Sequence, residues 1–392
     1  MLNFMRFSKD TSSSWLAMLP VAIICAGMTK PAVAWGKDAA KSGGTSGVSK
    51  KAYGKVGGKS VDIYTLTNKN GLVLKVTTYG AIVTELHVPD KNGKLADVVL
   101  GFDKVGQYAK ADSHFGALVG RVANRIKGAQ FALEGQTYKL GANNGPDHLH
   151  GGNLGWDRHI WQAEPQTTPD GAAVMMTYLS PDGDEGYPGA VKGVVTFTLT
   201  DSNEFRVDMK ATTDKATIIN LAHHTYWNLG GQKSGTILDH EMTVNADRYT
   251  PGAPQIPDGK IAPVAGTPFD FTKPKAIGKD LKAIGNEPVG YDMNYVVNGA
   301  ADAMRTVARV KDPKSGRVMV VEADQPGVQL YTSNYLNGTT KGKGRTHKQY
   351  DGFCLETQKF PNAINVPAWK DQVVLRAGQT YTHRMIHRFS AE

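Results

Sequence analysis

Apolar and polar residues alternate one by one along many short stretches of this 392-residue chain. The exchange is strict in residues 195–199 (Val-Thr-Phe-Thr-Leu) and 205–209 (Phe-Arg-Val-Asp-Met). Successive side chains of a β-strand point to opposite faces, so this pattern predicts antiparallel strands that each bury one face. Similar alternation occurs in residues 61–66, 72–78, 81–88, 174–179, 194–200 and 204–212.

Short segments of turn-forming residues connect several of these predicted strands. Residues 201–203 (Asp-Ser-Asn) predict one hairpin, and residues 312–316 (Asp-Pro-Lys-Ser-Gly) predict another. Residues 377–379 (Ala-Gly-Gln), just before the stretch 380–389, suggest a third hairpin. Long amphipathic helices are hard to find, whereas Gly and Pro are abundant. The sequence therefore predicts an all-β fold, a large antiparallel β-sandwich whose loops and strand ends carry the function.

The first 34 residues have the features of a secretory signal peptide. Arg6 and Lys9 precede an apolar stretch, and residues 32–34 form an Ala-x-Ala cleavage pattern. The apolar stretch is shorter than the roughly 20 residues that span a bilayer, which disfavours a membrane anchor. We expect a cleaved signal peptide at residues 1–34, a flexible linker at 35–51 and one domain at 52–392. We therefore expect a secreted, periplasmic protein.

Charge and cysteine content exclude several other classes. The formal net charge is +9, but no run of Arg or Lys is interleaved with aromatic residues, so we expect no nucleic-acid partner. We also expect no membrane association once the signal peptide is removed. Of the two cysteines, Cys25 lies in the predicted signal peptide, so only Cys354 would remain and no intramolecular disulfide could form. We expect Cys354 to be a small buried residue rather than a nucleophile.

Two short segments place a His and a Glu on polar strand faces. Residues 220–229 (Asn-Leu-Ala-His-His-Thr-Tyr-Trp-Asn-Leu), read as a strand, put His224 on a polar face and His223 on a mostly apolar one. Residues 352–358 put Glu356 opposite two apolar side chains in the same way. Because Glu and His are readily tuned for proton transfer near neutral pH, these two residues are candidates for an acid/base pair. From spacing alone, a structural role for each stays open.

The segment around His224 resembles the active-site signature of the aldose 1-epimerase (galactose mutarotase) family. Four further segments agree in order: residues 120–126 (Gly-Arg-Val-Ala-Asn-Arg-Ile), 149–152 (Leu-His-Gly-Gly), 290–294 (Gly-Tyr-Asp-Met-Asn) and 352–358 continuing through 361–365. The similarity extends from about residue 53 to residue 389. In one departure, the family usually has Thr-Asn before the catalytic His, where this chain has Ala222-His223. Because alternation points His223 away from His224, we expect this departure to change packing more than chemistry.

The resemblance implies a galactose mutarotase-like supersandwich that interconverts the α and β anomers of free aldohexoses such as galactose and glucose. It makes Glu356 the catalytic base, which takes the proton of the C1 hydroxyl, and His224 the catalytic acid, which enters protonated and donates to the ring oxygen. The ring would open to the aldehyde and reclose after rotation about C1–C2. The resemblance assigns the sugar hydroxyls and ring oxygen to Asn124, Arg125, His150 and Asp292. The partner would be a small aldose, with no cofactor.

The spacing of the histidines, taken alone, is also compatible with a metal site. Residues 148–150 (His-Leu-His) would put two imidazoles on one strand face, near the adjacent pair at 223–224. No Cys-x-x-Cys, His-Glu-x-x-His or dense carboxylate cluster accompanies them, so we expect no metal.

Two other functions could use the same residues. Asp292 and Glu356 could be the two carboxylates of a glycoside hydrolase. A non-catalytic carbohydrate-binding protein could instead use Trp161, Trp227 and Tyr331 as platforms on which a sugar stacks. Its sugar binding would not depend on Glu356.

Overall fold

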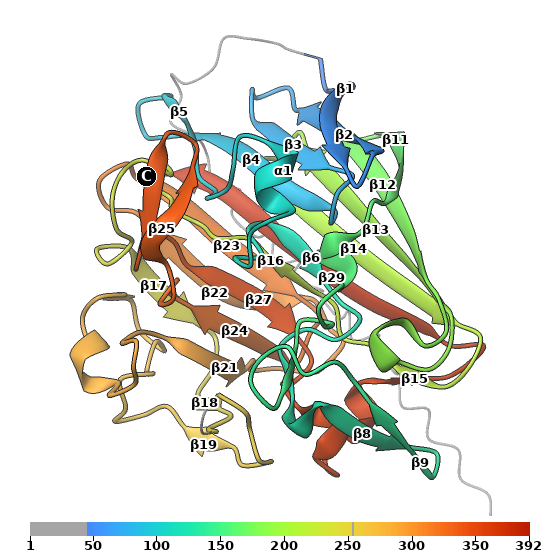
Figure 1. The fold of residues 1–392 in the computed structure, drawn as a ribbon. Helices are drawn as coiled ribbons and strands as arrows, with labels where there is room; N and C mark the ends of the chain where they lie inside the picture. Colours follow the sequence, from blue (N-terminus) through green and yellow to red (C-terminus); the bar gives the residue numbers. More distant parts are fainter. Residues whose placement is uncertain (1–44, 253–254) are drawn as a thin grey trace, which may run out of the picture. The chain divides into compact units, whose positions relative to one another are not determined.

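The fold consists almost entirely of antiparallel strands (Figure 1). The computed structural model describes residues 45–252 and 255–392. The predicted signal peptide, residues 1–34, and the first part of the predicted linker lie outside these residues. Within the described part, the one α-helix, α1, covers only Val105–Tyr108. Short 3₁₀ helices occur at Lys127–Ala129, Trp156–Arg158, Asp184–Gly186, Leu281–Ala283, Ala363–Asn365 and Lys370–Gln372. The prediction of a large antiparallel all-β fold is confirmed.

The largest sheet has nine strands. Their spatial order is β11 (Gln162–Thr168), β12 (Gly171–Ser180), β13 (Val191–Thr200), β14 (Glu204–Thr213), β29 (Thr380–Ala391), β23 (Arg317–Ala323), β22 (Arg305–Lys311), β17 (Glu241–Val244) and β20 (Lys275–Ala276). The predicted hairpins β13–β14 and β22–β23 both form. The hairpin predicted at residues 377–379 is wrong. The preceding strand β28 (Val374–Leu375) pairs with β15 (Thr217–Ile218), because both edges of β29 are already paired with β14 and β23.

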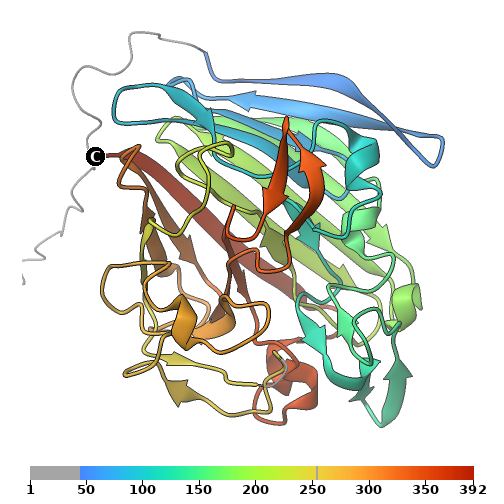
Figure 2. The ribbon, with the colours of Figure 1, turned by 60° about the vertical axis from the view of Figure 1, so that its left-hand side comes forward.

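A second, N-terminal sheet lies against the first. Its strands are β1 (Gly47–Val56), β2 (Lys59–Thr67), β3 (Val73–Thr77), β4 (Ile82–Pro89) and β5 (Leu95–Asp97), and β2 contacts β12 and β13 (Figure 2). Residues 47–51 were predicted to belong to the flexible linker, but they are part of β1 and pair with residues 63–67 of β2. Pairing satisfies the backbone groups that face β2, and Val48 packs against the core, so the folded domain begins before residue 52.

A third sheet and several two-stranded pairs carry the polar residues of interest. The third sheet has the order β19 (Ala262–Pro263), β18 (Arg248–Tyr249), β21 (Asp292–Val296), β24 (Gly327–Tyr331) and β27 (Cys354–Gln358). The pairs are β6 (Ala117–Val119) with β16 (Ala222–His224), β7 (Arg125–Ile126) with β10 (His148–Leu149), β8 (Gln130–Leu133) with β9 (Gln136–Lys139), and β25 (Asn337–Gly342) with β26 (Arg345–Lys348). No helix in the described part of the chain has the length and apolar character needed to cross a membrane.

Strands β16 and β27 each separate the hydrophobic core from a cavity. On the core side, the ring of His223 lies 5.8 Å from that of Phe197 and 5.7 Å from that of Phe205. Leu355 of β27 is buried in the same core. The alternate residues, His224 and Glu356, line the cavity on the opposite side. The strand alternation predicted from sequence therefore holds at both segments, although the regular strand β16 spans only three residues.

Candidate active site

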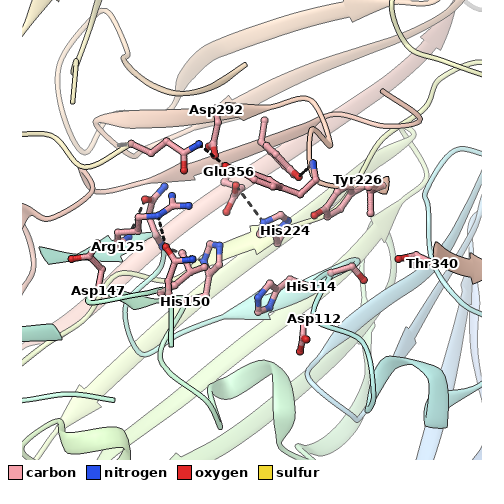
Figure 3. A pocket seen from close by; sticks show the side chains of 18 of the residues that line it. Asp112, His114, Arg125, Asp147, His150, His224, Tyr226, Asp292, Thr340 and Glu356 are labelled. Atoms are coloured by element: carbon pink, nitrogen blue, oxygen red, sulfur yellow. Dashed lines mark hydrogen bonds and ion pairs between the residues drawn. The ribbon is translucent and has the colours of Figure 1, made fainter. Parts of the chain in front are cut away.

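One cavity of about 740 Å³ contains all six residues that the resemblance assigned to catalysis or sugar binding. They are Asn124, Arg125, His150, His224, Asp292 and Glu356. Figure 3 shows Arg125 and Asp147 at one end of this cavity and Thr340 at the other, with His224 and Glu356 between them. The residues come from five elements or their flanking loops, far apart in sequence, and the sheet pairings bring them together.

His224 and Glu356 lie close together on one wall of the cavity. Nε2 of His224 is 3.6 Å from Oε1 of Glu356, and both side chains are buried. The other carboxylate oxygen, Oε2, has no hydrogen-bond partner within residues 45–252 and 255–392. A buried acceptor without a partner is costly, so this oxygen is ready to accept a hydrogen bond from a ligand hydroxyl.

Burial changes the proton affinity of both members of this pair. Burial and the nearby Asp292 carboxylate raise the pKa of Glu356 to about 8, against the opposing effect of Arg125. Burial and the neighbouring His114 lower the pKa of His224 to about 3. Between about pH 3 and about pH 8 the pair therefore holds one proton. Without a bound sugar, this proton is on Glu356. Strong opposite shifts in one cleft are typical of acid/base catalysts.

Cys354 lies beside His224 but is not built as a nucleophile. Its Sγ is 3.5 Å from Nδ1 of His224, and burial raises the pKa of the Cys354 thiol well above its usual range. The thiol therefore stays protonated, and its sulfur can accept a weak hydrogen bond from Nδ1–H of His224. This contact favours the neutral tautomer in which Nδ1 of His224 carries the hydrogen, so that Nε2 can take a proton from Glu356. The buried, unreactive role predicted for Cys354 agrees with the structure.

Asn124 and His150 hold each other in an unusual backbone conformation. Their φ angles are 60° and 51°, in the left-handed region that Asn tolerates better than most residues. The N–H of His150 donates to the carbonyl of Asn124 at 3.0 Å, and the N–H of Asn124 donates to Nδ1 of His150 at 3.2 Å. The next residue must be Gly151, because a Cβ there would lie 1.8 Å from the carbonyl oxygen of Gly120.

These bonds fix what the His150 ring can do. Burial and the neighbouring imidazoles lower the pKa of His150 well below its usual range, so the ring is neutral. Since Nδ1 accepts a hydrogen bond, Nε2 carries the hydrogen and donates into the cavity. His148 was expected on the same face, but this is wrong, because the chain turns at His150. Nδ1 of His148 instead lies 2.7 Å from the Gly141 carbonyl, and Nε2 lies 2.7 Å from the Tyr187 hydroxyl.

Arg125 and Asp292 are oriented by amide side chains. Nε of Arg125 donates to Oδ1 of Asn144 at 3.1 Å, so the guanidinium retains further donors for a ligand. Oδ1 of Asp292 accepts from Nε2 of Gln329 at 2.6 Å. Burial raises the pKa of Asp292, while Arg125 and this hydrogen bond oppose the rise. The pair can thus present both donors and acceptors to neighbouring hydroxyls.

A third imidazole, that of His114, lines the same cavity and was not predicted from the sequence. Its ring lies 4.9 Å from that of His150 and 5.8 Å from that of His224. Nδ1 of His114 contacts the buried carboxylate of Asp157 at 3.0 Å. With Nδ1 held by Asp157, Nε2 of His114 can exchange a hydrogen bond with a ligand. No motif in the sequence marks residues 112–114, and only the fold brings them beside β16.

The aromatic residues proposed as stacking platforms lie mostly elsewhere. Trp161 and Trp227 are 2% and 1% exposed and belong to the core, so neither can stack on a sugar. Trp227 packs instead against His387 and Phe389 of β29. Of the three proposed residues, only Tyr331 lines the cavity, where Tyr226 and Tyr335 also lie. Two of the three residues proposed for sugar stacking in a carbohydrate-binding protein, Trp161 and Trp227, therefore cannot contact a sugar.

Three metal-ligating atoms also meet here. One atom each from His150, His224 and Glu356 lie within 4.8 Å of one another, all buried. These side chains could by geometry hold a cation, although they are the same groups that form the acid/base pair. The expectation of no metal and no cofactor stays a prediction, which a chelator can test.

Comparisons with known proteins find similarity over most of the chain. Residues 62–388 match the family model described as aldose 1-epimerase. Galactose mutarotase from Bos taurus is 44% identical over 321 residues, covering 81% of this chain and 91% of the relative. The human galactose mutarotase is 42% identical, with 88% and 98% covered. A crystal structure of galactose 1-epimerase from Lactobacillus acidophilus NCFM superposes with a TM-score of 0.79 at 29% identity, covering 88% of this chain and 99% of that one.

Proposed function

The chain belongs to the aldose 1-epimerase family and is an aldose 1-epimerase, and on this premise we propose that Glu356 and His224 interconvert the anomers of free aldohexoses such as galactose and glucose. The observation that carries the assignment of these two residues is their 3.6 Å contact on the cavity wall, where one oxygen of Glu356 has no hydrogen-bond partner among the described residues. A base and an acid at this separation can act on two oxygens bonded to the same carbon.

In this mechanism the proton moves in a closed cycle. The C1 hydroxyl donates to Glu356, which favours the carboxylate and shifts the proton of the pair to Nε2 of His224. Glu356 then takes the C1 hydroxyl proton while His224 protonates the ring oxygen, the C1–O5 bond breaks and the C1 carbonyl forms. After rotation about C1–C2, the ring oxygen attacks the other face of the aldehyde. His224 recovers its proton from that oxygen, and Glu356 returns one to O1.

The surrounding residues hold the sugar through complementary hydrogen bonds. Arg125 and Nε2 of His150 donate, whereas Asp292 accepts. The side-chain amide of Asn124 can both donate and accept. Its Oδ1 already accepts from the N–H of Arg125 at 2.9 Å, but a carbonyl oxygen can accept a second hydrogen bond. Donors close to the ring oxygen stabilise the negative charge that develops on it as the bond breaks.

The charge of the cavity favours an unphosphorylated sugar. Among the described residues that line it, Arg125 is the one Arg or Lys, against the carboxylates of Asp112, Asp147, Asp292 and Glu356. A phosphate group needs a cluster of donors with positive charge, which this lining does not provide. A neutral polyol matches the mixture of amides, hydroxyls, imidazoles and carboxylates.

Polarimetry tests the proposed substrates. Purified protein should speed the approach to rotational equilibrium of freshly dissolved α-galactose and α-glucose, and EDTA should leave the rate unchanged. A methyl glycoside, which has no free C1 hydroxyl, should keep its rotation, whereas release of methanol would favour the glycoside hydrolase alternative. No acceleration with either free sugar would reject the proposed substrates.

The pKa shifts of Glu356 and His224 predict how kcat/KM depends on pH. Because the pair holds one proton below about pH 8, kcat/KM should be flat from about pH 5 to about pH 7.5. Above about pH 8 Glu356 deprotonates, the acid is lost, and kcat/KM should fall about tenfold per pH unit. The measurement is initial rates by polarimetry, corrected for the base-catalysed reaction in buffer. A rise through pH 6–7 instead would show a histidine of ordinary pKa near about 6.5 in control.

We also propose that the protein is exported, with cleavage after Ala34. The support is the arrangement of Arg6, Lys9, the apolar stretch and the Ala-x-Ala pattern in residues 1–34. Full-length chain expressed in a Gram-negative host should appear in the periplasmic fraction, and mass spectrometry should find Trp35 at its N-terminus. A chain lacking residues 2–34 is the control and should stay in the cytoplasm. An uncleaved full-length chain in the cytoplasm or the membrane would contradict this proposal.

A further inference from the structure

His114 contributes a third imidazole to the cavity, beside the two that the sugar meets in the proposed mechanism. Its ring lies 4.9 Å from that of His150 and 5.8 Å from that of His224, and those two rings lie 5.1 Å apart. We propose that His114, oriented by Asp157, is a further sugar-binding residue that recognises the C6 hydroxyl of a hexose. This inference rests on the proposed function, from which it takes the positions of C1 and the ring oxygen.

A buried carboxylate fixes the orientation of the His114 ring. Oδ2 of Asp157 lies 3.0 Å from Nδ1 of His114 and 3.4 Å from Nε of Arg158. Burial alone would raise the pKa of Asp157, but the hydrogen bond with His114 and the nearby guanidinium of Arg158 hold this pKa below its usual value. The carboxylate is therefore ionised and can only accept, so Nδ1–H of His114 donates to it. A ring held at Nδ1 in this way presents Nε2 in a fixed direction.

The chain segment of His114 offers polar groups that a ligand can use. Because Asp157 occupies Nδ1, Nε2 is the nitrogen left for a ligand in the cavity. A sugar hydroxyl is both donor and acceptor, so it can pair with Nε2 whichever of these roles Nε2 takes. The adjacent Ser113 also lines the cavity, and its buried Oγ has no hydrogen-bond partner among the described residues. A buried hydroxyl without a partner is costly, so a polar ligand group beside residues 113 and 114 stabilises this segment.

The backbone of His114 is held in a conformation that few residues adopt. Its φ angle is 52°, in the left-handed region, and the neighbouring His150 has the same feature with a φ angle of 51°. The carbonyl of His114 accepts from the N–H of Ala117 at 3.1 Å. Residue 116 must be glycine, because a Cβ there would lie 2.0 Å from the carbonyl oxygen of Val83. Backbone strain of this kind is concentrated at ligand-binding sites, which supports a binding role for both imidazoles.

The order of groups in the cavity assigns the C6 hydroxyl to His114. In the proposed mechanism, Glu356 meets the C1 hydroxyl and His224 meets the ring oxygen. Figure 3 shows His224 between Glu356 and His114. The ring oxygen of a hexopyranose joins C1 to C5, and C5 carries the hydroxymethyl group. A sugar with C1 at Glu356 and its ring oxygen at His224 therefore extends its C6 hydroxyl toward His114.

The first part of the test removes one oxygen from the sugar. 6-Deoxygalactose is galactose without the C6 hydroxyl, and polarimetry follows the anomers of both sugars. For the native enzyme, we expect kcat/KM for galactose to exceed that for 6-deoxygalactose about fivefold, the effect of one hydrogen bond between neutral groups. Most of the difference should lie in KM, because this hydrogen bond is made both before and during ring opening.

The second part separates Nε2 from the support that the His114 ring gives to its loop. His114→Asn keeps a donor near the position of Nδ1 and tolerates the left-handed backbone, but it has no group at the position of Nε2. In this variant, kcat/KM for galactose should fall about fivefold more than that for 6-deoxygalactose, so that the preference for the C6 hydroxyl disappears. His114→Gln is the matched control, because its longer side chain can place an amide near the position of Nε2 and should keep most of the preference.

Two results would overturn the inference. One is a native enzyme for which kcat/KM with galactose and with 6-deoxygalactose agree within about twofold. This comparison needs no variant, so it holds even if a substitution disturbs folding. The other is a His114→Asn variant that loses activity equally with both sugars, which would indicate that the ring only supports the cavity. A native protein that accelerates neither galactose nor glucose would instead reject the proposed function, so the two failures are distinguishable.

Discussion

Replacing Glu356 with Gln should lower kcat about 10³-fold while changing KM for galactose less than about threefold. The substitution keeps the size of the side chain and its capacity to hydrogen-bond, but an amide cannot take the C1 hydroxyl proton. The binding groups contributed by Arg125, His150 and Asp292 are untouched. Polarimetry with saturating sugar gives kcat, and intrinsic fluorescence or isothermal titration of the variant reports whether the sugar still binds.

The matched control is Glu322→Gln, the same chemical change outside the cavity. Glu322 lies on β23 and pairs with Nη2 of Arg388 at 3.0 Å. A partly exposed pair of this kind contributes about 0–1 kcal/mol to stability, and it lies outside the cavity, so this variant should keep native kcat. If Glu356→Gln retains more than about a tenth of the native kcat, Glu356 is not the base. Equal losses in both variants would point to misfolding.

The parts of the fold that could be predicted from sequence are those that depend on neighbouring residues. Alternation of apolar and polar side chains identified β13 and β14 and their hairpin, because the period of two and the turn residues are both local. The same alternation separated His224 from His223 and Glu356 from Leu355 correctly. Strand β1 was not predicted, because its residues are largely exposed and its sequence shows little alternation of apolar and polar residues.

The parts that could not be predicted depend on contacts between distant segments. His114 lies beside His224 only because β6 pairs with β16 and Asp157 is placed behind it. Residues 148–150 would present both imidazoles on one face as a strand, but the left-handed φ of His150 turns them apart. Likewise, the third hairpin was expected from a local turn, whereas the partner of β29 was decided by the nine-stranded sheet.

The adjacent histidines allow the acid to be tested with one chemical change at two positions. His224→Asn should lower kcat about 10²–10³-fold, because Asn cannot deliver a proton to the ring oxygen, while the fold stays intact. His223→Asn should leave kcat of the folded protein within about twofold but should cost about 1–3 kcal/mol of stability. The reason is that His223 faces the core between Phe197 and Phe205, where Asn leaves a gap and an unsatisfied amide.

The two readouts separate catalysis from packing because neither variant is expected to show both effects. Kinetics by polarimetry should identify His224, and thermal unfolding followed by circular dichroism should identify His223. His223→Asn also restores the residue that the family usually has before its catalytic His. Its effect on thermal stability therefore shows how strongly the packing of this core depends on a histidine at position 223. Native kcat in His224→Asn, or a loss of kcat in His223→Asn without a change in thermal stability, would contradict the division of β16 into a reacting face and a core face.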